Sequence, residues 1–167
     1  MSEDTNNGDI LEYPINWLEV HRDTKLLVRK LIDKGPFKGL IAVTRGGLVP
    51  AAIVAREMGI RQVDTICASS YDHMNQGERV EFLKLPDEAM KEEGEGWLVV
   101  DDLVDSGKTA HEIRKLMPKV HIATVYGKPK GLNACDTFVR EFTQDTWIHF
   151  PWDLDIKYVK PVASESD

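Results

Sequence analysis

The chain has little of what marks several classes of protein. Its 167 residues include two cysteines, Cys67 and Cys135, which are too few and too far apart for a disulfide framework or a cysteine zinc site. No apolar run approaches the roughly 18 residues that a membrane-spanning helix needs. The N-terminal residues also lack the basic and apolar regions of a signal peptide. We therefore expect a reduced, cytosolic protein.

Positive charge is scarce as well. The chain has 21 lysines and arginines against 28 aspartates and glutamates, a formal net charge of -7. This balance argues against nucleic-acid binding driven by overall charge. It is compatible with an anionic substrate, because local amides, a lysine and a metal ion can outweigh a distant acidic surface.

The pattern of apolar residues predicts one α/β domain over residues 1–167, with frayed polar ends at 1–9 and 164–167. We expect helices over residues 17–32, 48–58 and 110–116. We expect strands over residues 39–43, 63–68, 97–100, 120–126 and 137–142, a returning hairpin arm over 80–84 and a mobile loop over 69–76. Strands that alternate with helices of this length predict a mainly parallel central sheet flanked by helices.

The stretch from Gly96 to Thr109 carries the strongest functional pattern. An apolar strand ends in Asp101 and Asp102, Asp105 follows, and a small-residue loop then opens a helix. An Asp-Asp pair alone is most often a turn or cap. Here, however, the helix start offers backbone amides to a phosphate at the ligand-binding edge of a parallel sheet. Carboxylates beside that phosphate would repel it unless a divalent cation or sugar hydroxyls lay between them, so we predict a phosphorylated sugar with Mg²⁺.

A nucleotide-triphosphate P-loop is the obvious competitor, because Gly107-Lys108-Thr109 copies the end of that motif. The motif requires a glycine five positions before Gly107, and this chain has Asp102 there. A carboxylate would stand where the backbone must wrap a phosphate. The P-loop interpretation is therefore excluded.

Residues 99–109 resemble the ribosyl-diphosphate-binding signature of type I phosphoribosyltransferases. Other segments are similar to the xanthine-guanine branch of that family and run in the family's order over residues 38–155. These segments are residues 40–59 (with Thr44-Arg45-Gly46-Gly47-Leu48-Val49-Pro50), 69–73, 126–129, 144–148 and 151–153. The resemblance implies the type I phosphoribosyltransferase fold, with a small hood and a flexible lid loop.

The resemblance also implies where the sugar diphosphate binds. Asp102 would assist Mg²⁺, with Asp101 beside it, and the amides of residues 105–109 would hold the 5-phosphate. The full set implied for the sugar diphosphate and its phosphate is Arg45, Gly46, Arg79, Asp101, Asp102, Leu103, Val104, Asp105, Ser106, Gly107, Lys108 and Thr109. The lid pair would be Ser70 and Tyr71.

For the purine, the resemblance places Asp105 near N7, where it would handle the proton, and makes Asp101, Asp102 and Asp105 the catalytic set. Lys128 would donate to the 6-oxo group, because an ammonium donates only and the amino group of adenine is a poor acceptor. Trp147 would stack on the ring. The remaining implied purine contacts are the backbone of Ile148 and, more weakly, Asp153.

Two departures from the family pattern concern single residues. The family's usual Thr-Gly-Gly-Thr is Ser106-Gly107-Lys108-Thr109 here, so Lys108 either points to solvent or adds a cation near the phosphate. One extra residue near Gly77 precedes Arg79, and Lys84 is the alternative to Arg79 for the diphosphate.

The function implied is purine salvage. The enzyme would transfer the 5-phosphoribosyl group from 5-phospho-α-D-ribose 1-diphosphate to N9 of guanine or xanthine, and more weakly hypoxanthine, giving GMP, XMP or IMP and diphosphate. The alternative is a non-catalytic regulator of the same fold that senses the sugar diphosphate. Such a sensor would carry a DNA-binding segment or a basic face, or lack the third acid, whereas this acidic chain keeps Asp105. The resemblance further implies a homotetramer and weak association with the inner-membrane surface.

Overall fold

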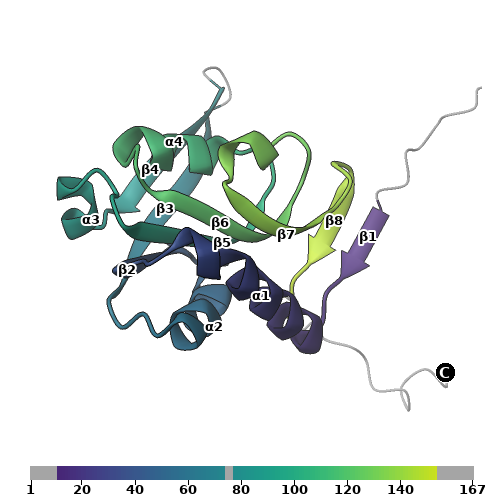
Figure 1. The fold of residues 1–167 in the computed structure, drawn as a ribbon. Helices are drawn as coiled ribbons and strands as arrows, with labels where there is room; N and C mark the ends of the chain where they lie inside the picture. The colour runs from purple at the N-terminus through teal and green to yellow at the C-terminus, as the bar shows by residue number, and fades with distance from the viewer. Residues whose placement is uncertain (1–10, 74–76, 154–167) are drawn as a thin grey trace, which may run out of the picture.

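A six-stranded, mostly parallel sheet lies at the centre of the molecule, with helices on both faces (Figure 1). The structure is a computed structural model that describes residues 11–73 and 77–153, and of residues 70–73 and 77–79 it describes the backbone alone. This architecture confirms the α/β fold predicted from the sequence. No helix in the described part of the chain is long and apolar enough to cross a membrane.

The elements follow one another along the chain with short connections. The strands are β1 (Leu11–Pro14), β2 (Gly39–Thr44), β3 (Val63–His73), β4 (Gly77–Lys84), β5 (Trp97–Val104), β6 (His121–Gly127), β7 (Thr137–Glu141) and β8 (Thr146–His149). The helices are α1 (Trp17–Leu31), α2 (Leu48–Met58), α3 (Asp87–Lys91) and α4 (Lys108–Leu116), with 3-10 turns at Ile32–Lys34 and Leu132–Ala134.

The order of the strands indicates where in the sheet a ligand would bind. The sheet runs β4-β3-β2-β5-β6-β7, and only the β3–β4 pair within it is antiparallel. From β2 the chain moves outward to β3, whereas from β5 it moves the other way to β6 and β7. The strand order therefore reverses between β2 and β5, and doubly wound sheets bind ligands outside the carboxyl ends of the strands at such a point.

The two central strands are buried on both faces, as expected for a covered parallel sheet. Leu40 of β2 and Leu98 of β5 face the core that α1 and α2 cover. Ile41 and Val99, one position on, face the core on the side of α4. This alternation explains why the sequence of both strands reads as a continuous apolar run rather than an alternating one.

A second, two-stranded sheet pairs β1 with β8 in parallel, from Leu11 opposite Thr146 to Pro14 opposite His149. It lies beside the β7 edge of the main sheet (Figure 1). Arg140 of β7 joins the two sheets, because its guanidinium lies 4.7 Å from the ring centre of Tyr13 in β1. Neither β1 nor the short helix α3 was predicted from the sequence.

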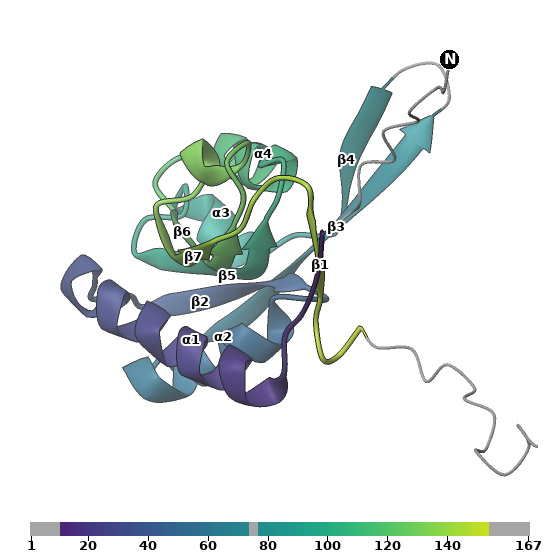
Figure 2. The ribbon, with the colours of Figure 1, turned by 90° about the vertical axis from the view of Figure 1, so that its right-hand side faces the viewer.

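The segment predicted to be a loop over residues 69–76 is different in the structure. Strand β3 continues to His73, and β3 and β4 form a hairpin that projects from the body (Figure 2). Ser70 pairs with Val80, and Tyr71 pairs with Arg79. Backbone pairing to an adjacent strand needs no apolar alternation, so the sequence pattern did not reveal it. The side chains of Ser70, Tyr71 and Arg79 lie outside the described residues.

A buried hydrogen bond fixes α1 against β6. The hydroxyl of Tyr126 donates to Oδ2 of Asp23 over 2.9 Å, and both side chains are almost inaccessible to water. Arg22 donates from Nε to the other oxygen, Oδ1, over 2.9 Å. Burial and the neighbouring Asp23 carboxylate raise the pKa of Tyr126, so its hydroxyl keeps the proton that it donates.

Tyr126→Phe should lower the free energy of unfolding by about 1.5–3 kcal/mol, because a buried carboxylate loses a hydrogen-bond donor. Urea denaturation at neutral pH measures this loss. The matched control is Tyr13→Phe, whose hydroxyl donates to the partly exposed Glu19 and accepts from the partly exposed Arg140; it should cost less than about 1 kcal/mol because water can reach both partners. Equal stability of Tyr126→Phe and the parent protein would show that the bond contributes nothing.

Candidate active site

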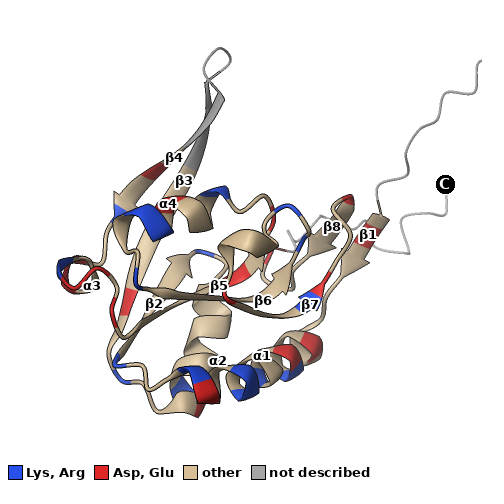
Figure 3. Ribbon diagram, turned by 45° about the horizontal axis from the view of Figure 1, so that its top comes forward, with Lys and Arg blue, Asp and Glu red and all other residues tan. Residues whose placement is uncertain are grey.

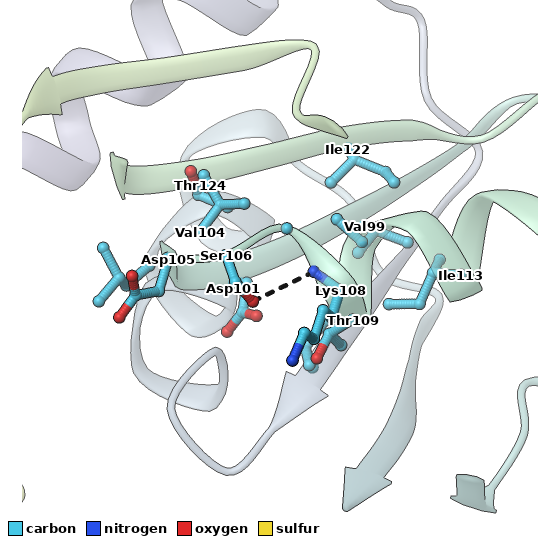
Figure 4. Close-up of a pocket in the computed structure, with 14 residues that line it drawn as sticks. Val99, Asp101, Val104, Asp105, Ser106, Lys108, Thr109, Ile113, Ile122 and Thr124 are labelled. Carbon is cyan, nitrogen blue, oxygen red and sulfur yellow. Dashed lines mark hydrogen bonds between the residues drawn. The ribbon is translucent and has the colours of Figure 1, made fainter. Parts of the chain in front are cut away.

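A cavity of about 140 Å³ lies beneath the loop that joins β5 to α4 (Figure 4). One wall is apolar and comes from β2, β5, β6 and α4. The polar lining comes from the end of β5, the loop and the first residues of α4. The apolar wall comprises Val43, Val99, Ile113 and Ile122, and the polar side comprises Asp101, Asp105, Ser106, Gly107, Lys108 and Thr109.

Asp101 and Asp102 are neighbours near the end of β5, and their carboxyl groups lie within hydrogen-bonding reach of each other. Asp101 lines the cavity under the loop. Asp102 faces the loop after β2, so closely that a Cβ on Gly46 would collide with its carboxylate. Any side chain at position 46 would therefore displace Asp102, and only glycine fits there. The strand continues through both acids to Val104, whereas the sequence predicted that it ended at them.

The two carboxylates are held by neighbouring amides and are short of positive charge. Asp101 Oδ1 accepts from the amide of Asp102 over 2.9 Å, and Asp102 Oδ1 accepts from the amide of Leu103 over 2.7 Å. Burial, and then the adjacent Asp102, raise the pKa of Asp101 well above its usual range. Burial also raises the pKa of Asp102, with a contribution from the negative charge of Asp153. The arrangement favours a bound cation.

The loop after β2 lies at the same edge. Its Thr44–Arg45 peptide bond is cis, the Arg45 side chain is exposed, and Gly47 packs against the carbonyl oxygens of Val43 and Val100. Arg45 and Gly46 are thus brought beside Asp102, at the strand-order reversal between β2 and β5. The resemblance assigned both residues to the diphosphate.

The loop before α4 has the geometry of an anion-binding helix start. Gly107 has a φ of 82° and precedes the first helical residue, and the amide of Lys108 lies 3.5 Å from Ser106 Oγ (Figure 4). The first amides of α4, including that of Thr109, have no acceptor within the helix and point outward from its N-terminus. The side chains of Leu103 and Val104 pack against the two cores, and both residues also line the cavity.

The carboxylate of Asp105 does not face the apolar wall of the cavity: it points away from Val99 and Ile113 (Figure 4). Each of its oxygens has a partner from elsewhere in the sheet. Lys128 Nζ donates to Oδ2 over 3.0 Å, and Gln144 Nε2 donates to Oδ1 over 2.7 Å. The Lys128 side chain is 6% exposed and that of Asp105 is 52% exposed. A buried ammonium and a half-exposed carboxylate therefore meet where the resemblance placed the purine.

The remaining purine residues lie on and after β8. Trp147 is 62% exposed, whereas the neighbouring Ile148 is 9% exposed and packs into the core. The ring of Trp147 is thus open to solvent, and Ile148 can offer only its backbone. Asp153 is exposed and lies close enough to Asp102 to act on it electrostatically. Gln144, which the sequence analysis left without a role, is the additional contact found here.

The hairpin residues are placed only by their backbone. Arg79 lies in β4 opposite Tyr71, so both belong to the projecting hairpin, and their side chains are outside the described residues. Lys84, the alternative to Arg79, is bonded to Asp64 and to the carbonyl of Thr65 at the base of the hairpin. Its ammonium already has two acceptors, which argues against the alternative.

The donor set suits Mg²⁺ better than a metal bound entirely by protein. Residues 11–73 and 77–153 contain no group of three or more histidine, cysteine, aspartate or glutamate residues that could hold a metal ion. Mg²⁺ is commonly held by one or two carboxylates together with waters and substrate oxygens. Asp102, with a raised pKa and little compensating charge, fits such a ligand.

Comparison with known proteins agrees with this geometry. A family model described as a phosphoribosyl transferase domain matches residues 17–158. The chain belongs to the phosphoribosyltransferase family. It is similar to the xanthine-guanine phosphoribosyltransferase of Nitratidesulfovibrio vulgaris strain DP4, with 50% identity over 92% of this chain and 91% of that one. The enzyme of that name from Desulfotalea psychrophila is 53% identical over 90% of this chain and 91% of its own.

Among solved structures, the purine phosphoribosyltransferase of Pyrococcus horikoshii superposes on this phosphoribosyltransferase with a TM-score of 0.72. The two chains are 26% identical, and the match covers 89% of this chain and 99% of the other. Fold and family are therefore shared well beyond the short signature around Asp105.

Asp101→Asn should stabilise the protein at neutral pH when chelator is present and substrate is absent. A carboxyl group whose pKa is raised by folding contributes full stability below its unfolded pKa of about 3.9 and loses it as pH rises through the native pKa. Asparagine cannot ionise, so this loss should disappear. The urea midpoint of Asp101→Asn should exceed that of the parent at pH 7, and the gap should narrow toward pH 4.

The control for that comparison is Asp33→Asn, an amide substitution at an exposed aspartate remote from the site. Its urea midpoint should follow the parent at every pH. A midpoint of Asp101→Asn that is equal to or below the parent at pH 7 would mean that the native protein tolerates the ionised pair without cost.

Proposed function

We propose that this phosphoribosyltransferase moves the 5-phosphoribosyl group from 5-phospho-α-D-ribose 1-diphosphate to N9 of guanine or xanthine, and more weakly of hypoxanthine. The products are GMP, XMP or IMP, and diphosphate. One observation carries the proposal: Asp105, beside an anion-binding helix start, is bonded to the buried Lys128. A proton acceptor and an oxo-group donor are thus within reach of one base. The names and identities of the relatives support the choice of substrates.

The reaction makes one bond and breaks one. Purine N9 forms a bond to C1 of the ribose, the bond from C1 to the diphosphate oxygen breaks, and the diphosphate leaves with that electron pair. Asp105 accepts the proton that the purine loses at N7. The sugar passes through an oxocarbenium-like state, and the nearby negative charges of Asp101 and Asp102 stabilise its positive charge.

The sugar diphosphate is proposed to lie across the carboxyl ends of β2 and β5. The amides of residues 105–109 hold the 5-phosphate, and Arg45 with Gly46 holds the diphosphate. Mg²⁺, bound beside Asp102, would neutralise charge on the diphosphate and ribose oxygens. Ser70, Tyr71 and Arg79 of the hairpin are proposed to cover the diphosphate, which would keep water from the activated sugar.

The purine is proposed to bind over β8 and the turn after β6. Lys128 donates to the 6-oxo group, which excludes adenine because its amino group at that position also donates. The exposed ring of Trp147 stacks on the base, and the backbone of Ile148 meets its edge. Asp153 is the weaker candidate for the exocyclic group.

Assembly and location are predictions that depend on family resemblance: a homotetramer, and weak association with the cytoplasmic face of the inner membrane. Nucleic acid is not a proposed partner. Basic and acidic residues lie together along α1 (Figure 3), which differs from the single-sign basic face that binds phosphate backbones.

With Mg²⁺ and the sugar diphosphate, the purified protein should convert guanine, xanthine and hypoxanthine to their nucleotides, with adenine the poorest substrate. A buried donor left facing a second donor typically costs the wrong substrate about a hundredfold or more in kcat/KM. Chromatography of the four nucleotide products measures the order. Equal turnover of adenine and guanine would refute the role of Lys128, and absence of any nucleotide would favour the sensor alternative.

Asp105→Ala should lower kcat for guanine by about 10²- to 10⁴-fold, the usual contribution of a positioned base. Binding of the sugar diphosphate should persist, because the amides that hold its phosphate are unchanged; calorimetry with Mg²⁺ measures it. Asp33→Ala is the control, since it removes an exposed aspartate far from the site. Turnover of Asp105→Ala within twofold of the control would remove Asp105 from the mechanism.

A further inference from the structure

The turn between β7 and β8 carries a side chain that contacts the proposed base directly. Gln144 Nε2 donates to Oδ1 of Asp105 over 2.7 Å, a contact between residues 39 positions apart. The other end of the same amide, Oε1, accepts from the backbone N–H of Lys130 over 3.0 Å. Gln144 therefore connects the loop after β5 with the turn after β6.

We propose that Gln144 is a positioning residue: it holds Oδ1 of Asp105 so that Oδ2 stays directed at the purine. This proposal rests on the proposed function of Asp105. Oδ2 is identified as the purine-facing oxygen because Lys128, the proposed donor to the 6-oxo group, contacts it. The two oxygens thus have separate tasks, one fixed by the protein and the other available to the base.

The chemistry of the partners determines the orientation of the Gln144 amide. Asp105 offers only acceptors when ionised, so it must face the NH₂ group, and the N–H of Lys130 must face the amide oxygen. The reversed amide would bring an oxygen against a carboxylate and a donor against a donor. Gln144 is therefore held by two hydrogen bonds that agree with each other, and its side chain is partly buried.

Asp105 benefits from such a support because it is half-exposed and lies in a loop. Its side chain is 52% exposed, and it lies in the loop before α4 rather than on a strand or helix. When a 6-oxopurine shares the Lys128 ammonium, the contact of Lys128 with Oδ2 must weaken, and the Gln144 bond to Oδ1 remains. A general base whose orientation is fixed during this exchange is already placed to accept the proton from N7.

The ionisable groups near Asp105 include two from neighbouring elements. Lys128, after β6, contacts it directly, and Asp145, next to Gln144, interacts electrostatically with Lys128. Gln144 itself is neutral. Gln144→Glu has nearly the same shape and can still accept from Lys130, but it places a second carboxylate against Oδ1. Gln144→Met keeps the length without either hydrogen bond.

Both variants should keep the parent's far-ultraviolet circular dichroism and its KM for the sugar diphosphate, and both should lower kcat for guanine about tenfold or more through loss of positioning. Gln144→Glu should in addition move the acidic limb of the kcat–pH profile up by about one pH unit, because a like charge favours protonated Asp105. Gln144→Met should leave that limb in place. A role in stability alone would not separate the two variants in this way.

The matched control is Gln62→Glu, which makes the same change beside Glu88 at the amino-terminal edge of the sheet, away from the site. It should match the parent in kcat and in pH profile. The proposal is overturned if Gln144→Met turns over guanine as fast as this control. It is also overturned if the acidic limb of Gln144→Glu does not move, or if that of Gln62→Glu moves equally.

A measurement without turnover separates this proposal from the proposed function. In substrate-free protein labelled with ¹³C at aspartate carboxyls, and with Asp105 assigned by comparison with Asp105→Asn, the Asp105 resonance should titrate at higher pH in Gln144→Glu than in the parent. If the parent makes no nucleotide, the proposed function fails while this shift still shows the contact. If the parent is active and the shift is absent, the positioning role fails alone.

Discussion

Two adjacent carboxylates at the end of a buried strand are the constraint on which the site depends. Neither Asp101 nor Asp102 can be ionised there without cost, because burial removes water and each charge opposes the other. A proton held between the two carboxyl groups reduces the conflict, because the side chains lie within hydrogen-bonding reach of each other. What remains is an unbalanced negative charge at the strand-order reversal, which a cation and a positively charged sugar both relieve. Gly46 is the residue whose absent side chain leaves room for the arrangement.

The residues near that constraint could be predicted because their pattern is local. The apolar run before Asp101, the small residues from Ser106 to Thr109 and the following helix all lie within residues 97–116, and each element has its own sequence signal. The strand end was the error: β5 continues to Val104, since pairing with β6 supplies hydrogen bonds that polar side chains do not prevent. Asp101 and Asp102 are therefore residues of a continuing strand, and their carboxyl groups remain in contact with each other.

The rest of the site is assembled by contacts between distant segments, which a single sequence does not encode as a pattern. Strand β1 exists because β8, about 135 positions later, pairs with it, and the four residues of either strand alone carry no periodicity. The bond from Gln144 to Asp105 is of the same kind. A glutamine beside a turn usually faces solvent, so only the arrangement of three loops at one sheet edge gives it a partner.

The burial of Lys128 links the architecture to selectivity. An ammonium that is 6% exposed cannot be satisfied by water and must find oxygen acceptors within the protein, and Asp105 supplies one. A 6-oxopurine brings a further acceptor to the same ammonium, whereas the amino group of adenine would set a donor against a donor in a space that excludes water. The penalty for the wrong base thus comes from the same desolvation that makes Asp105 an obligatory partner of Lys128. Oδ2 of Asp105 then serves both the Lys128 ammonium and the purine proton. The other oxygen, Oδ1, needs a separate hydrogen-bond partner, and Gln144 donates to it.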